Sequence, residues 1–497
     1  MRKIFLFILL SCVAAVNAQD IEMPSLTKEQ MRQDVEFLVQ AIKEIEPNIP
    51  IREKVTGTKI YDEINKLAQS VDTISSFESF YYLTQRILLL CQDQHEDIRQ
   101  YPAGLENNNY YIDAQAIERT KYSNRKYDPF MIIPTPIQYV NGNFYYSANS
   151  YLAHNMKTVV LPAKAQILKI GDIDVDYYVA TWNRLKDNSI RWDFKNKKYY
   201  TNRFYSPEDV GLNIDDSHTY QINDSIITLH FMEDLGIVGW HCDFKNLFAF
   251  QVQYFGKEKI LYIRIPSMDE EQIPYLQKNI LKYKNRQISK VVIDIRYNGG
   301  GSDWVWEEVI SSIIDKPIIS DSRVYYKNTP LVVDYVTKIR ESEIVKTFQI
   351  NGENYFSTSE TENDTISPDS VSLNYNGKIY VLVNEKIFSS SLAFVSVCKQ
   401  AENLVTVGTA TGYMCGRSTT PFFLSLPNSK LIFELVPCID MSGNKNNPED
   451  FYDFQAEIPV NLTIDDYVFE MEYKGKRYGK DFLYNHDPIF QKVLEMK

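Results

Sequence analysis

Residues 377–416 read GKIYVLVNEKIFSSSLAFVSVCKQAENLVTVGTATGYMCG, and this stretch decides the fold of the C-terminal part of the chain. The apolar run Ile379–Val383 predicts a buried strand, and apolar residues recurring after the serines predict a helix. A second short strand is expected over Leu404–Val407. The three serines 389–391 therefore open a helix, where backbone N–H groups are unpaired and the dipole favours negative charge. They either cap the helix or include a nucleophile.

The same alternation of strands and helices begins before this stretch. Strands are expected over residues 260–265 and 291–295, and helices over 269–283 and 305–314, the last capped by Ser302 or Asp303. This order predicts a largely parallel sheet covered by helices. Functional groups in such sheets lie where a strand is followed by a helix.

Three consecutive glycines follow the strand at 291–295. Glycine lets backbone N–H groups approach a substrate carbonyl without an intervening side chain. The amides of Gly299–Gly301, together with the amide of the residue that follows the nucleophile, are therefore candidate donors to an oxyanion formed when a serine attacks. Alternatively, the three glycines form a tight turn that has no catalytic role.

Helical periodicity dominates the N-terminal part. Thr27 and Gln30 predict a capping box for a first helix, and a second helix is expected to begin near Ser75. The second helix ends in the polar run 92–97, which contains His95. A histidine at such a position is commonly a surface or capping residue.

The chain divides into four predicted parts. Residues 1–18 are a signal peptide, and 19–106 are a helical domain. Residues 107–256 show short β-branched runs between Asn, Asp and Gly clusters, which predicts a β-rich region. Within it, 161–185 predicts a strand, a Gly-Asp turn, a strand and a helix. Residues 257–497 are the α/β core.

The signal peptide is identified by its charge and apolar pattern. Arg2 and Lys3 precede an apolar run, and residues 16–18 satisfy the small-residue rule for cleavage. In the alternative interpretation, Cys12 lies in a lipoprotein box and carries a lipid. No later stretch has the length of a membrane span. We therefore expect an exported, soluble protein, periplasmic or extracellular.

Composition narrows the class of protein. The chain is 44% hydrophobic and 24% charged, as in ordinary globular proteins, and its net charge of -12 argues against nucleic acid as a partner. Zinc-type spacings and phosphate-binding glycine loops are absent, so no metal or organic cofactor is expected. Removal of residues 1–18 takes Cys12 from the six cysteines and leaves five, most of them in apolar runs typical of buried packing.

Two motifs in order carry a resemblance to a known family. VVIDIRYNGGGSD at 291–303, followed by IYVLVNEKIFSSSLAF at 379–394, resembles the C-terminal processing, or tail-specific, serine proteases. That family includes the tricorn core protease and the repeats of interphotoreceptor retinoid-binding protein. The resemblance covers residues 257–468 and extends more loosely to earlier parts. It implies a crotonase- or ClpP-like α/β core and a degenerate PDZ-like domain in the middle region.

The resemblance also implies the catalytic groups. The nucleophile falls on Ser389, and the oxyanion donors fall on Gly300 or Gly301 and on the Ser390 amide. The resemblance therefore implies hydrolysis of a peptide or protein substrate.

The family divides by its catalytic base. The processing branch has a lysine where this chain has Met414, whose thioether cannot accept a proton, so a Ser-Lys mechanism is excluded. The tricorn-like branch uses a histidine in a D-G-H-T-like motif, and the run Asp93-Gln94-His95-Glu96 stands in that place. An imidazole with a pKa of about 6.5 is a competent base near neutrality.

In the tricorn-like branch an acid orients the histidine. The match around residues 453–460 places it on Asp450, with Glu449 as its neighbour. A carboxylate in such an acidic, Asn-rich stretch is otherwise simply solvated.

The sequence thus predicts an exported serine peptidase that uses Ser389 and His95. One alternative is a catalytically lapsed binding protein on the same scaffold, with a peptide or hydrophobic ligand, and another is an esterase. No nucleic acid and no membrane span are expected, and the oligomeric state is left open.

Overall fold

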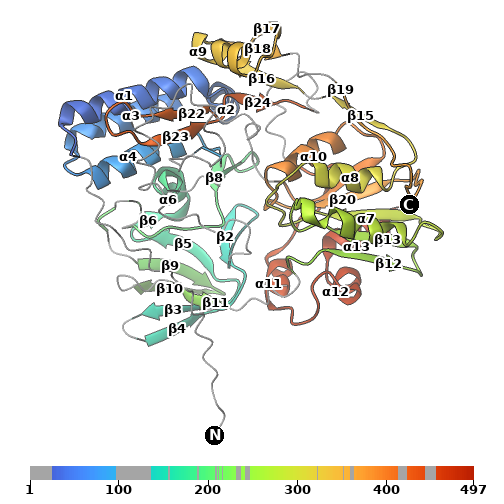
Figure 1. Ribbon diagram of the computed structural model, residues 1–497. Coiled ribbons are helices and arrows are strands. Elements are labelled where there is room, and N and C mark those ends of the chain that lie inside the picture. Colours follow the sequence, from blue (N-terminus) through green and yellow to red (C-terminus); the bar gives the residue numbers. More distant parts are fainter. Residues whose placement is uncertain are drawn as a thin grey trace, which may run out of the picture.

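The computed structural model describes residues 25–93, 95–96, 136–154, 157–186, 190–207, 210, 212–214, 217–230, 237–240, 247–321, 323–350, 352–358, 363–411, 422–442 and 455–496. In Figure 1 the N-terminal helices lie above the β-rich middle region, and the α/β core lies beside both. The expected fold class, an α/β core with a helical N-terminal region and a β-rich middle, is confirmed.

The described residues of the N-terminal region form four α-helices packed around apolar side chains: α1 (Lys28–Ile45), α2 (Ile49–Thr56), α3 (Ile60–Gln69) and α4 (Phe77–Leu89). The capping box of Thr27 and Gln30 is confirmed, because each side chain accepts from the other residue's backbone N–H. The expected start of the second helix was one residue off. Ser76, not Ser75, caps α4 by accepting from Ser79 N at 3.1 Å.

A hairpin from the C-terminal part completes the helical core. Its strands are β22 (Phe422–Ser425) and β23 (Ile432–Leu435), and their apolar side chains belong to the same buried cluster as those of α1 and α4. The Asp34 carboxylate on α1 accepts from the backbone N–H groups of Asn428 and Ser429, each at 2.7 Å. The helical region is therefore joined to the core by a segment nearly four hundred residues away in sequence.

The middle region is built from short strands. One sheet has the order β1-β2-β5-β9-β10, with β6 paired to β5, and β3, β4 and β11 form a second sheet. The bounds are β1 (Ile137–Val140), β2 (Asn143–Tyr146), β3 (Ser150–His154), β4 (Lys157–Leu161), β5 (Gln166–Ile170), β6 (Ile173–Asp174), β9 (Ser217–Ile222), β10 (Ser225–His230) and β11 (Ile237–Trp240). Helix α6 (Val175–Thr181) follows β6, which confirms the predicted strand, Gly-Asp turn, strand and helix.

A two-stranded ribbon of the middle region faces the core. It pairs β7 (Arg191–Asp193) with β8 (Lys198–Tyr200), with Arg191 opposite Tyr200. The Arg191 guanidinium donates to the backbone carbonyl of Glu385 in the core. The middle region and the core therefore make direct contact through this ribbon.

The core is a six-stranded sheet in the order β12-β13-β14-β20-β21-β25. All neighbouring pairs are parallel except β12 with β13. The bounds are β12 (Gln251–Phe255), β13 (Ile260–Arg264), β14 (Lys290–Asp294), β20 (Ile379–Val383), β21 (Leu404–Gly408) and β25 (Ile458–Pro459). Strands β13, β20 and β21 are buried along their whole length, as expected for a parallel sheet covered on both faces.

Helices cover both faces of this sheet. One face packs against α7 (Ile273–Leu281), α8 (Trp304–Ser311) and α10 (Ser390–Cys398), and the other against α12 (Lys480–Asn485) and α13 (Pro488–Glu495). The predicted helix at 269–283 is a 3₁₀ turn (Glu270–Gln272) followed by α7. Asp303 is the N-cap residue of α8, but its side chain makes no capping bond.

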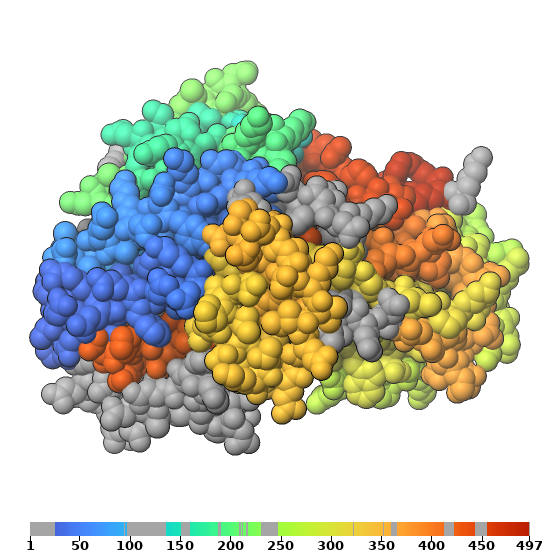
Figure 2. Space-filling model, turned by 90° about the horizontal axis from the view of Figure 1, so that it is seen from above, coloured from blue at the N-terminus to red at the C-terminus, as the bar shows by residue number. Residues whose placement is uncertain are grey.

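Further strands connect the core to the helical region. A four-stranded sheet has the order β17-β18-β16-β24, and β15 pairs with β19. Figure 2 shows the gold segment around β17 and β18 between the N-terminal helices and the core. The bounds are β15 (Ile318–Asp321), β16 (Val324–Lys327), α9 (Pro330–Asp334), β17 (Ile344–Ile350), β18 (Glu353–Thr358), β19 (Asn363–Ile366), β24 (Cys438–Asp440) and α11 (Ile464–Glu472).

Two further predictions from the sequence concern the cysteines and membrane-spanning helices. Cys91, Cys398 and Cys438 are buried free thiols, as their apolar surroundings predicted. Cys12, Cys242 and Cys415 lie outside the described residues. Among the helices that the structure describes, none combines the length and the apolar character needed to cross a bilayer.

Candidate active site

Ser389 lies at the turn between β20 and α10. Its backbone has φ 54° and ψ −125°, a conformation that costs a non-glycine residue on the order of 1–3 kcal/mol. It occupies the N-cap position of α10, but its side chain makes no capping hydrogen bond. Simple capping therefore does not explain Ser389, and strain of this kind is typical of functional sites.

The three serines differ in accessibility. Ser389 is half-buried, whereas Ser390 and Ser391 are buried. The hydroxyl oxygens of Ser390 and Ser391 have no hydrogen-bond partner within the described part of the chain. Of the three serines, Ser389 alone is partly exposed to solvent.

The glycine turn after β14 packs directly against this serine. Gly300 has φ +102°, and a Cβ added to it would lie 2.6 Å from Ser389 Cβ and 2.8 Å from the Phe388 carbonyl oxygen. Phe388 N donates to the Asn298 carbonyl at 3.0 Å. A plain tight turn would not need this close approach, so only glycine fits at position 300.

The candidate oxyanion donors are not equivalent. Gly300 N donates to the side chain of Asn298 at 2.8 Å. Among the described residues, the backbone N–H groups of Gly301 and Ser390 have no acceptor. Gly301 also has to be glycine, because a Cβ there would lie 2.2 Å from the Met268 carbonyl oxygen. The geometry therefore favours the amides of Gly301 and Ser390 over that of Gly300.

His95 reaches this turn from the helical region. Its ring lies 4.6 Å from the ring of Phe388, centroid to centroid, with the planes 33° apart. Phe388 immediately precedes Ser389, and consecutive Cα atoms are only about 3.8 Å apart. His95 is buried rather than a surface residue. The structure thus places His95 in contact with the residue before Ser389, while the glycine turn packs against Ser389 itself.

Asp93 is a site residue to which sequence reasoning gave no role. Its Oδ1 lies 3.1 Å from His95 Nδ1 and accepts from His95 N at 2.9 Å. The side chain of Asp93 is fully buried. A carboxylate that accepts from Nδ1–H favours the tautomer in which Nε2 carries no proton and can act as a base. The signal was present in the sequence, because Asp93 begins the Asp-Gln-His-Glu run.

Further buried ionisable groups hold the histidine segment. Arg52 on α2 donates to the backbone carbonyls of Leu90 and Cys91, just after α4. Glu96 Oε1 accepts from Val436 N at 3.0 Å, which ties the segment to the residue after β23. Burial, and then the charge of Glu46, raise the pKa of Glu96 well above its ordinary value.

Glu46 is the second buried acid of this cluster. Its carboxylate accepts from the backbone N–H groups of Asn48 at 3.0 Å and Ile49 at 2.8 Å, at the start of α2. Burial raises the pKa of Glu46 to about 7, although Arg52 and these hydrogen bonds act in the opposite direction.

Asp294 at the end of β14 and Arg296, just before the glycine turn, have a structural role. The Asp294 carboxylate accepts from Arg264 at 2.9 Å and from Arg296 at 2.6 Å, and all three residues are buried. Burial alone would raise the pKa of Asp294, but Arg296 and Arg264 lower it to about 2. Arg296 also pairs at 2.7 Å with Asp487, the N-cap residue of α13. The network fixes the edge of the sheet from which the glycine turn departs.

Asp450, Glu449 and Met414 lie outside the described residues, so their predicted roles stay predictions. Within the described ranges, no group of three or more His, Cys, Asp or Glu side chains is arranged to hold a metal ion.

The chain resembles known peptidases in part of its sequence and in its fold. Residues 259–436 match peptidase family S41. Mature CPAF in complex with lactacystin has a similar fold, with 14% identity and a TM-score of 0.54 over 90% of this chain and 96% of that one. A CPAF mutant gives 13% identity and a TM-score of 0.55 over 95% and 99%. At these identities the likeness shows the fold alone. No curated protein sequence matches the chain significantly.

The resemblance to the C-terminal processing serine proteases is thereby confirmed. The expected enzyme class, a serine-type peptidase, is confirmed at the level of the family.

Proposed function

We propose that this chain, whose residues 259–436 form a peptidase family S41 domain, is an exported serine peptidase with Ser389 as nucleophile and His95 as base. One observation carries the proposal. A strained, accessible serine at the start of a helix packs against a glycine turn, and the His95 ring lies on the residue that precedes it. A binding protein that had lost catalysis would have no need to maintain this strained backbone.

The proposed reaction uses these groups in the following order. With Nδ1–H donating to Asp93, Nε2 of His95 accepts the proton of Ser389 Oγ, which attacks the peptide carbonyl carbon. The amides of Gly301 and Ser390 donate to the oxyanion of the tetrahedral intermediate. His95 then transfers the proton to the leaving amine, and water hydrolyses the acyl-enzyme with His95 again as base.

Two carboxylates are candidates for orienting His95. Asp93 has the observed contact at 3.1 Å. Asp450 was predicted from the family resemblance and lies outside the described residues. We assign the role to Asp93, because its contact holds the ring in the tautomer that the mechanism requires.

Two finer parts of the proposal rest on the sequence. The charged and apolar pattern of residues 1–18 supports export to a periplasmic or extracellular location. The strand, turn, strand and helix over β5, β6 and α6 support a PDZ-like origin for the middle region.

Labelling with a fluorophosphonate probe tests the central claim. Wild-type protein should react covalently, and Ser389→Ala and His95→Ala should lose the labelling. Ser391→Ala is the matched serine control because Ser391 is fully buried, and it should still label. A folded wild-type protein that does not label, or one labelled at another serine, would contradict the assignment.

A further inference from the structure

Two buried asparagines join the glycine turn to the serine turn, and neither takes part in the reaction itself. Asn298 lies in the turn after β14, and Asn384 follows β20. The backbone carbonyl of Asn298 accepts from Phe388 N at 3.0 Å, and Asn384 Oδ1 accepts from Tyr297 N at 3.1 Å. Each asparagine therefore bonds to the turn that follows the other strand.

The side-chain amide of Asn298 is bonded at both ends. Its Oδ1 accepts from Gly300 N at 2.8 Å, and its Nδ2 donates to the carbonyl of Ile265, just after β13, at 2.9 Å. These bonds fix the peptide unit between Gly299 and Gly300 relative to the sheet. The side chain at this position must supply an acceptor and a donor together, which an amide does and an ionised carboxylate does not.

The next peptide unit carries the N–H of Gly301. Its carbonyl, that of Gly300, accepts from Met268 N at 2.9 Å, and Ser302 N donates to the Met268 carbonyl at 2.9 Å. Because the C=O and N–H groups of a trans peptide point in opposite directions, the Gly301 N–H points away from Met268. Asn298 and Met268 thus fix the peptide units on the two sides of Gly300, and the direction of the Gly301 N–H depends on both.

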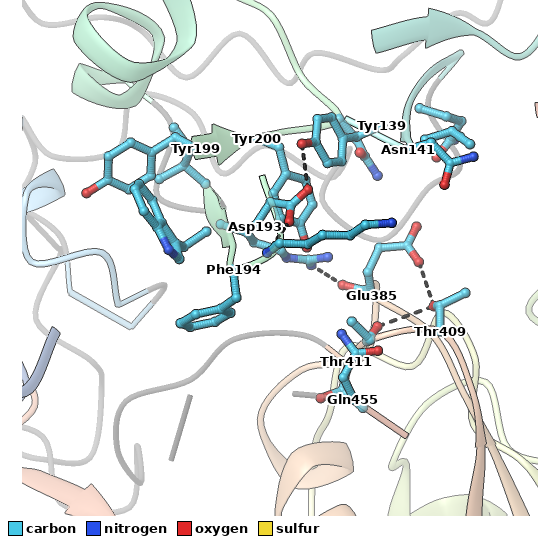
Figure 3. Close-up of a pocket in the computed structure, with 18 of the residues that line it drawn as sticks. Tyr139, Asn141, Asp193, Phe194, Tyr199, Tyr200, Glu385, Thr409, Thr411 and Gln455 are labelled. Carbon is cyan, nitrogen blue, oxygen red and sulfur yellow. Dashed lines mark hydrogen bonds between the residues drawn. The ribbon is translucent and has the colours of Figure 1, made fainter. Parts of the chain in front are cut away.

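The serine turn borders open space at its start, so packing holds it from one side only. A cavity of about 700 Å³ lies between the helical region, the middle region and the core, and Glu385, the residue after Asn384, lines it. Figure 3 shows Glu385 across the cavity from Tyr139 and Asp193 of the middle region. Asn384 Oδ1 also accepts from Lys386 N at 3.2 Å. Hydrogen bonds to Asn384 therefore hold the start of the turn beside the cavity.

We propose that Asn298 is a positioning residue of the oxyanion hole. Its side-chain amide holds the glycine turn in the conformation in which the Gly301 N–H meets the oxyanion formed when Ser389 attacks. Asn384 supports this turn as an acceptor only. The proposal rests on the proposed function, because it takes Ser389 as the nucleophile and Gly301 as an oxyanion donor.

Replacement by aspartate distinguishes the two positions. Asn298→Asp keeps an acceptor for Gly300 N but places a second acceptor against the Ile265 carbonyl, whereas Asn384→Asp keeps the acceptor of both bonds to its Oδ1. The readout is labelling by a fluorophosphonate probe, with the maximal rate constant and the half-saturating probe concentration measured separately. Asn298→Asp should lower the rate constant about 10²-fold with little change in the half-saturating concentration. Asn384→Asp should stay within about threefold of the wild-type rate constant.

Asn183 provides the matched control. It is fully buried in the middle region, its Nδ2 donates to the Arg203 carbonyl at 3.0 Å, and its Oδ1 accepts from Tyr205 N at 2.9 Å. Its amide makes the same two kinds of bond as that of Asn298. Asn183→Asp should therefore destabilise the protein to urea, as Asn298→Asp does, but label at the wild-type rate when folded. The pH dependence of labelling, which reports on His95, should be unchanged in all three variants.

The outcomes separate the positioning role from the proposed function. A wild-type rate constant in Asn298→Asp, an equal loss in Asn384→Asp, or an equal loss in Asn183→Asp would overturn the positioning role and leave Ser389 as the nucleophile. A wild-type protein that does not label would refute both claims.

Circular dichroism of each variant establishes that it is folded. Asn298→Ala removes both bonds without adding a charge and should show the same fall in rate constant. If neither Asn298 variant folds where Asn183→Asp does, Asn298 is required for folding and the proposal is overturned.

Discussion

The two turns that meet at the proposed active site are held in different ways. The Ser389 turn is held by backbone packing, since it follows a fully buried parallel strand and lies against a glycine that has no room for a side chain. The His95 segment is held by buried polar groups, among them Arg52, Asp93 and Glu96. We call the Ser389 turn the serine half of the site and the His95 segment the histidine half. The geometry of the serine half should therefore be disturbed by added side-chain volume, and that of the histidine half by the loss of a buried ionisable group.

The largest effect is expected for Gly300→Ala. The new methyl group would lie 2.6 Å from Ser389 Cβ at a φ of +102°, so the serine turn has to move. We expect fluorophosphonate labelling to fall by at least about 10³-fold. The control is Gly352→Ala, which has φ +84° but no atom within 4 Å of the added Cβ. It should cost only about 1 kcal/mol of stability and leave labelling intact. Equal effects in the two variants would show that backbone strain, not the contact with Ser389, is decisive.

The next largest effect is expected for a substitution that removes a group holding the His95 segment. Arg52→Met removes the guanidinium that binds the Leu90 and Cys91 carbonyls and interacts with the buried acid Glu46. Breaking such a buried set by removing one partner costs about 3–5 kcal/mol, measured by urea unfolding. Arg32→Met removes an exposed ion pair with Asp72 and should have no measurable effect. A loss in Arg52→Met no larger than that in Arg32→Met would refute the role of buried charge.

Asp93→Asn probes orientation of the histidine without changing the shape of the side chain. The amide can present its N–H₂ to Nδ1 and favour the wrong tautomer, so kcat should fall by roughly 10²- to 10³-fold while KM changes little. Asp93→Glu should recover part of the activity. Asp450→Asn, tested in parallel, distinguishes the two acids. If only Asp450→Asn lowers kcat, the orienting group is Asp450 and the contact at Asp93 is structural.

The smallest effect is a pH dependence of stability. The folded pKa of Glu46 is about 7, above its ordinary value of 4.5. Between these pH values the folded state keeps a proton that the unfolded state has lost, so the free energy of unfolding decreases as pH rises. The contribution is complete below about pH 4.5 and lost above about pH 7. We expect a difference on the order of 2–3 kcal/mol. Urea unfolding from pH 4.5 to 8 should show this decrease in the free energy of unfolding in the wild type and a smaller decrease in Glu46→Gln. An identical pH dependence in the two proteins would contradict the prediction.

The sequence by itself determined the core elements and the serine half of the site. Ile379–Val383 was predicted with its observed bounds because a strand buried on both faces must be apolar throughout. The glycines and serines were recognisable because each follows such a strand. The element bounds at 269–283 and the cap of α8 were less accurate, because turns and side-chain rotamers depend on neighbours that sequence does not reveal.

Only the tertiary structure decided how the histidine half is built. Asp93 stood beside His95 in the sequence, but its role depends on burial and on ring orientation. The choice of Gly301 over Gly300 as oxyanion donor depends on one bond to Asn298. The cavity is formed by three segments that meet only after folding. Helices and strands can be predicted from sequence because the spacing of apolar residues that defines them is local. A functional site consists of contacts between residues that are distant in sequence, and the packing of the whole chain determines those contacts.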